Sequence, residues 1–188
     1  MKERNDLSGA YEDTINLQEM SKEFLIKLLG EWQEQYRVLN EGLYEAALKR
    51  VPMEQFNEIL IAANMHMYQA TMPRLNKLAG IEPKTLLDLN RVGQLSIDSN
   101  KSQGYFESYE EIISPNHFVA TVTKCPYLEA AEDMGIPEFI KPLCEVVEPA
   151  LMPFYYQNHP KLKITPLKLP PRQSKSEICC KLEFKIEQ

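Results

Sequence analysis

The chain has 188 residues, which is enough for one well-buried core, so a single domain over residues 1–188 is expected. Its formal net charge of −6 argues against nucleic acid as a partner, because binding to a phosphate backbone depends on a basic surface. No apolar run is long enough to span a bilayer and the first residues lack the apolar stretch of a secretory signal, so we expect a cytoplasmic protein with no membrane partner.

The first half of the chain is predicted to be helical. Residues 1–15 are expected to be flexible and residues 16–100 to form the helical part. Asn16 with Glu19 three residues later resembles a capping box at the start of the first helix. Gly30 and Gly42 are expected to be weak points of this region, and a second segment is expected from Glu41 to Arg50. The apolar residues that recur at helical spacing here are Leu17, Met20, Phe24, Leu28, Trp32, Tyr36 and Leu39.

Two more helices are predicted before the character of the sequence changes. Pro52 suits the first turn of the next helix, which Pro73 is expected to kink and Gly80 to end as a left-handed cap. A shorter helix is expected over about residues 84–97.

Some apolar residues of this half are candidates for the wall of a small-molecule pocket. They are Met65, Met67, Tyr68 and Tyr105, and thioether side chains adapt well to irregular ligands. Methionine at helical spacing also fills gaps in ordinary cores. The same stripe is equally consistent with an interface to a second copy of the chain, as in a homo-oligomer.

The second half, residues 101–188, is predicted to contain both strands and helices. Four strands are expected, at residues 105–113, 117–124, 161–169 and 177–186. The first two form a hairpin, because Ser114-Pro115-Asn116 between them is a turn-forming sequence. Two helical segments lie between the strand pairs, one after Pro126 and one near Pro137. We therefore predict an α+β fold, with the N-terminal helical half packed on an antiparallel sheet of about four strands in ββααββ order.

The four cysteines carry the clearest chemistry of the second half. A cytoplasmic location argues against disulfides, so they are interpreted as core residues, metal ligands or nucleophiles. In the last strand Cys180 shares the inward face with Leu182, while Cys179 is expected on the opposite, wet face. Cys144 falls on the inward face of a helix, and Cys125 stands at a helix N-terminus, where a thiol pKa can be lowered.

Three of these thiols come from three different elements and are predicted to meet at one site. Cys125, Cys144 and Cys180 would hold zinc, with His117 or His159 as a further ligand, or an iron–sulfur cluster with one exposed iron. The alternative is that each thiol is a small hydrophobic core residue, because free cysteine is among the most buried residue types.

Several short runs resemble the L-2-amino-thiazoline-4-carboxylic acid hydrolase family. They are His117–Glu129, Gly135–Glu138, Leu143–Glu145 and Cys180–Phe184. The second half is also similar to the vinyl reductase type of small-molecule-binding domain. The resemblance implies that the recurring cysteines of the family correspond to Cys125, Cys144 and Cys180, and that the chain opens a small heterocycle by hydrolysis or binds a small ligand.

Two functions therefore remain open. A hydrolase would use Cys125 as a thiolate nucleophile, or a metal on the three cysteines to polarise water, with His117 or Glu145 handling protons. A non-enzymatic binding or sensor domain would instead keep a structural zinc or iron–sulfur site on the same cysteines. The sequence has no motif for nucleotide binding, metalloprotease chemistry or serine hydrolase chemistry.

Overall fold

The computed structural model describes residues 4–8, 16–96, 106–137 and 140–187. These residues form two compact units, Met1–Val51 and Pro52–Gln188, and each is described by itself. The prediction of a single domain over the whole chain stays a prediction.

The first unit consists mainly of one long helix. A short 3-10 turn, η1 (Leu17–Glu19), is capped by Asn16, and the helix α1 (Lys22–Leu48) begins after Ser21, whose side chain accepts a hydrogen bond from the Phe24 N–H at 3.2 Å. Asn16 therefore caps only the short turn. The division expected at Gly42 is wrong, because α1 continues through it, and helix interiors tolerate a single glycine at a cost of about 1 kcal/mol.

The second unit opens with two helices whose ends follow the predicted signals. The helix α2 (Met53–Ala79) begins directly after Pro52, and Gly80 ends it with a φ of 67°. A left-handed residue at this place is typical of a helix C-terminus, and glycine adopts it without a steric penalty. The shorter helix α3 (Leu86–Gly93) starts with a reciprocal capping box between Thr85 and Asp88.

The four predicted strands form one antiparallel sheet. They are β1 (Glu107–Ser114), β2 (His117–Lys124), β3 (Leu162–Lys168) and β4 (Cys180–Ile186), in the spatial order β1-β2-β4-β3. The hairpin turn between β1 and β2 also meets α3, because Asn116 accepts a hydrogen bond from the Leu86 N–H at 3.0 Å. The last strand begins at Cys180, three residues later than expected.

The connection from β2 to β3 contains the remaining helices. They are α4 (Pro126–Asp133), α5 (Ile140–Pro142), the π-helix η3 (Leu143–Val147) and α6 (Glu148–Tyr155). In η3 the Glu148 N–H bonds to the Leu143 carbonyl, and Pro149, which has no N–H, cannot extend an α-helical ladder here. The helical type therefore changes just ahead of Pro149.

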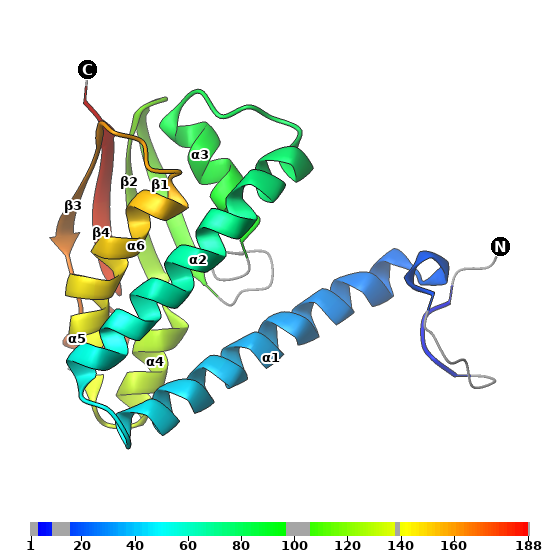
Figure 1. The fold of residues 1–188 in the computed structure, drawn as a ribbon, viewed down its shortest axis with the longest axis horizontal. Coiled ribbons are helices and arrows are strands. Elements are labelled where there is room, and N and C mark those ends of the chain that lie inside the picture. The colour runs from blue at the N-terminus through cyan, green and yellow to red at the C-terminus, as the bar shows by residue number, and fades with distance from the viewer. Residues whose placement is uncertain (1–3, 9–15, 97–105, 138–139, 188) are drawn as a thin grey trace. The chain divides into compact units, whose positions relative to one another are not determined.

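The core of this unit joins the sheet to the helices through stacked aromatic rings. Phe118 of β2 stacks on Phe184 of β4 with ring centroids 4.9 Å apart, and Tyr156 at the end of α6 lies 5.3 Å from Phe184. Tyr155 then contacts Tyr68 of α2, edge to face, at 5.8 Å. In Figure 1, α6 and α2 accordingly lie on the same side of the sheet.

The α+β class, the four-stranded antiparallel sheet and the ββααββ order are confirmed, with α4 as one helical segment and the run from α5 to α6 as the other. Among the described residues, no helix is long and apolar enough to cross a membrane.

Candidate functional site

The sheet register brings two of the predicted site cysteines to the same end of the sheet. β2 and β4 are antiparallel with Val122 opposite Cys180, and Cys125 follows the last residue of β2. The chain then enters α4 at Pro126, so Cys125 is also the N-cap residue of that helix. The end of one central strand and the start of the other therefore contribute one thiol each.

Cys144 joins them from the π-helix η3. The charges that Cys125 and Cys180 would carry as thiolates both raise the pKa of Cys144, so the three thiols lie within electrostatic range of one another. They come from three separate elements, as expected from the sequence, and each keeps some exposed surface. We refer to Cys125, Cys144 and Cys180 as the cysteine cluster.

Burial keeps the cluster thiols protonated. Desolvation is the largest cause for each of them and raises the pKa of Cys125 and of Cys180 to about 12, while the pKa of Cys144 also rises. The backbone N–H groups of Leu128 and Tyr127 act in the opposite direction on Cys125. The expectation that the helix N-terminus lowers the pKa of Cys125 is therefore wrong, because desolvation outweighs the amide groups.

Two carboxylates lie near the cluster on the helical side. Glu145 is exposed, is 3.8 Å from the Lys141 ammonium and acts electrostatically on Cys144. Glu148, in the first turn of α6, acts on both Cys144 and Cys180. Sequence reasoning missed Glu148, although its position four residues after Cys144 is a spacing that places side chains together on a helix.

Cys179 is a further site residue that the strand pattern misplaced. It was expected on the wet face, yet its exposed fraction is 1%. β4 begins only at Cys180, so Cys179 lies outside the strand alternation on which that expectation depended. Its thiol donates to the Thr123 carbonyl at 3.4 Å and accepts a hydrogen bond from Arg172 Nη1 at 3.5 Å.

The two histidines predicted as further ligands, His117 and His159, lie toward the other end of the sheet. His117 opens β2, and a strand of eight residues separates its ends by roughly 23 Å, so His117 is not brought to Cys125. Its Nε2 lies 2.8 Å from Glu183 Oε1 instead. His159 precedes β3, whose Leu162 pairs with Ile186 at the far end of β4 from Cys180.

The metal prediction has no preformed ligand set in the part of the chain that the structure describes. There, no group of three or more His, Cys, Asp and Glu side chains is arranged to hold a metal ion. Zinc or an iron–sulfur cluster on Cys125, Cys144 and Cys180 therefore stays a prediction.

The predicted pocket residues differ in how deeply they are buried. Tyr68 is buried in the aromatic core against Tyr155, and Met65 and Met67 are half-buried on α2. Tyr105 lies outside the described residues. Their role in a pocket stays a prediction.

Comparison with known proteins gives one match. A family model described as L-2-amino-thiazoline-4-carboxylic acid hydrolase matches residues 32–184, which is most of the chain. No curated protein and no solved structure matches it.

Proposed function

The chain belongs to the L-2-amino-thiazoline-4-carboxylic acid hydrolase family, and from this membership we propose that it hydrolyses a small heterocycle with a C–N or C–S bond at the cysteine cluster. The observation that supports the site is that Cys125 and Cys180 lie at the same end of the sheet, with Cys144 of η3 within electrostatic range of both. The family defines a hydrolase-like protein, and the use of the thiols is the new part of the proposal.

A protonated thiol fits addition to a C=N bond. The Cys125 sulfur bonds to the carbon, the π electrons move to the nitrogen, and the thiol proton ends on that nitrogen. The nitrogen lone pair re-forms the C=N bond as a ring C–N or C–S bond breaks, and the departing ring atom takes up the proton that this nitrogen releases. Water then adds to the carbon and displaces the Cys125 sulfur, which takes one proton of the water and is a thiol again, and the carbon becomes a C=O group. Because the pKa of Cys125 is about 12, the proton has to leave as the bond forms.

The carboxylates of Glu145 and Glu148 are the proposed proton acceptors for the attacking water. Both act on Cys144, and Glu148 also acts on Cys180, so a molecule held among the three sulfurs would lie near these groups. His117 has no part in this proposal, since it stands at the opposite end of β2. The proposed reaction uses the thiols and needs no metal ion.

A non-enzymatic binding or sensor domain is the second candidate. The high pKa of the cluster thiols favours it, because reactive cysteines usually have a lowered pKa. In that function the same sulfurs line the ligand site and no bond is broken.

The test compares wild type with Cys125→Ser on L-2-amino-thiazoline-4-carboxylic acid, with ring opening followed by mass spectrometry. We expect Cys125→Ser to lower turnover at least about a thousandfold, because it removes the nucleophile, while the far-UV circular dichroism stays unchanged. His117→Asn is expected to change turnover less than about threefold, since its side chain is remote from Cys125.

The same preparations decide between the candidates. Retained turnover in Cys125→Ser would remove Cys125 from the mechanism, and ligand binding without turnover in the wild type would favour the binding domain. Elemental analysis of the anaerobically purified protein measures zinc and iron, and a metal bound in stoichiometric amount would replace the thiol mechanism by one on the metal.

A further inference from the structure

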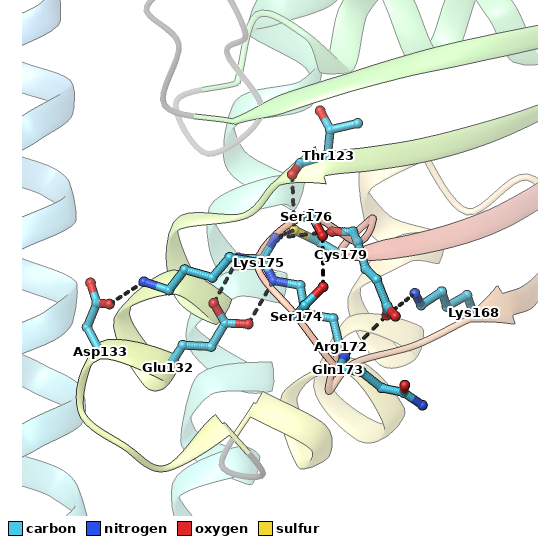
Figure 2. Close-up of polar contacts among 11 residues, drawn as sticks. Thr123, Glu132, Asp133, Lys168, Arg172, Gln173, Ser174, Lys175, Ser176 and Cys179 are labelled. Carbon is cyan, nitrogen blue, oxygen red and sulfur yellow. Dashed lines mark hydrogen bonds and ion pairs between the residues drawn. The ribbon is translucent and has the colours of Figure 1, made fainter.

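A buried arginine side chain contacts Cys179, the residue directly before Cys180 of the cysteine cluster. Arg172, in the loop between β3 and β4, donates from Nε and Nη2 to the two carboxylate oxygens of Glu132 in α4, at 2.7 and 2.8 Å. Its Nη1 donates to the Cys179 sulfur at 3.5 Å and to the Glu177 carbonyl at 3.3 Å. Figure 2 shows the guanidinium between Glu132 and Cys179. The Arg172 side chain is 3% exposed and that of Glu132 12%.

Cys179 carries this contact to the strand that leads into the cluster. Its backbone N–H donates to the Val122 carbonyl at 2.8 Å and its thiol donates to the Thr123 carbonyl at 3.4 Å. Thr123 is two residues before Cys125, and Cys179 directly precedes Cys180. A displacement of Cys179 would therefore move two of the three cluster thiols.

We infer that Arg172, held by Glu132, is a positioning residue for the cysteine cluster, which fixes Cys179 against the end of β2 and so sets the placement of Cys125 and Cys180. The guanidinium is suited to this because its donors form a rigid fork, so one side chain can bond to both Glu132 oxygens and to the sulfur at once.

The charge balance supports a geometric role. Glu132 forms a bidentate ion pair with Arg172, and Glu129 of α4 adds a second negative charge nearby. The groups that act on Cys179 are thus Arg172, Glu129 and Glu132, besides the backbone N–H of Cys125. Glu129 and Glu132 act against Arg172 on the Cys179 thiol, so the role assigned to Arg172 depends on the fixed position of its donors.

The same loop offers a matched control. Lys175 forms an ion pair with Asp133 at 2.8 Å, which joins the same loop to the same helix one residue further along α4. Both side chains are largely exposed, at 68% and 69%. Among the described residues, neither side chain forms a hydrogen bond with a cysteine. Loss of this pair removes one tie between loop and helix without touching Cys179.

The experiment measures alkylation of each cysteine by iodoacetamide in the folded, full-length protein at one mildly alkaline pH, with peptide mass spectrometry. In Arg172→Ala we expect Cys179 to react about tenfold faster or more than in the wild type, because a buried thiol reacts only when its surroundings open. Lys175→Ala should keep the wild-type rates. Millimolar guanidinium should restore the protection of Cys179 in Arg172→Ala, whereas methylammonium should not.

The catalytic consequence rests on the proposed function: kcat should fall at least about tenfold in Arg172→Ala with KM within about twofold, and guanidinium should restore it. Alkylation needs no substrate, so an absence of hydrolysis would reject the proposed function and leave the positioning test intact. Cys179 protected in Arg172→Ala as in the wild type, or opened equally by Lys175→Ala, would overturn the inference.

Arg172→Lys serves if Arg172→Ala does not fold. An ammonium keeps the charge but cannot bond to Glu132 and Cys179 together in a fixed fork. The variant is therefore expected to fold with Cys179 alkylated about threefold faster or more than in the wild type. Unchanged protection in Arg172→Lys would overturn the role of the fork.

Discussion

The four cysteine thiols differ in whether a cation lies near the sulfur atom, which affects the pKa of each thiol. Burial raises the pKa of Cys125, Cys144 and Cys180, neighbouring thiols raise it further, and among the described residues no cation acts on them. Burial also raises the pKa of Cys179, but the Arg172 guanidinium opposes it. The cluster is therefore a set of neutral thiols at neutral pH, and a cationic ligand would lower their pKa on binding.

The high pKa of Cys125 predicts a loss of stability in alkaline solution. Folding raises this pKa from 9.0 to about 12, so the contribution to stability is complete below pH 9 and is lost as the pH rises toward 12. In urea unfolding under reducing conditions, the wild type should lose about 1 kcal/mol more than Cys125→Ser between neutral pH and about pH 10. Equal losses in the two proteins would contradict the buried, protonated state of Cys125.

At this scale the sequence predicted the inward Cys180 but not the buried Cys179. Alternation along a strand is a local rule, and it applies only to residues inside the strand. Cys179 lies one residue before β4, where Arg172 and Thr123 determine its environment. Those partners are distant or irregular in sequence, so no periodic pattern could indicate them.

Among the helices, α3 depends on a close approach that only glycine permits. A Cβ atom at Gly93, the last residue of α3, would lie 2.2 Å from ring atoms of Tyr155. Tyr155 is buried between Tyr68 and Tyr156, so its ring has little room to move. The packing of α3 on α6 is therefore set by the missing side chain of Gly93.

Gly93→Ala is expected to destabilise the protein by about 1–3 kcal/mol, because the added methyl group overpacks the contact with Tyr155. Gly42→Ala in α1 is the matched control, since a Cβ there meets nothing within 4 Å. It should stabilise the helix by up to about 1 kcal/mol. Both values are measured by denaturant unfolding, and a neutral or stabilising Gly93→Ala would contradict the described packing.

Helix ends were predicted where local signals act alone. Pro52 and Gly80 mark the ends of α2 as expected, because each restricts or permits a particular φ angle by itself. Gly42 does not end α1, since a glycine in mid-helix only weakens the helix and the flanking residues decide the outcome. The π-helix η3 could not be predicted from helical periodicity, which assumes one hydrogen-bond pattern throughout.

Considered as a whole, the chain contains a second unit with its own core. This unit, Pro52–Gln188, contains the four-stranded sheet and the aromatic contacts that link Phe118 to Tyr68. It also contains the ion pair between Arg172 and Glu132. The first unit contains one long helix after a short turn, and most of the stability of a helix in a protein comes from tertiary packing.

A fragment of residues 52–188 should therefore fold by itself. We expect it to unfold cooperatively in urea and to keep Cys179 protected from alkylation, because every described partner of that side chain is present. A fragment that lacks a cooperative transition would show that the first unit is needed for the core, in favour of a single domain.

The sequence by itself determined most of the helices, the four strands and the α+β class, because periodicity, caps and turn residues act over a few positions. Apart from the hairpin of β1 and β2, which its turn residues indicated, only the tertiary structure decided which strands are neighbours and in which register. The register between β2 and β4 places Cys125 at the same end of the sheet as Cys180 and leaves His117 at the opposite end of β2. Strand pairing depends on contacts between residues far apart in the chain, which local patterns do not encode.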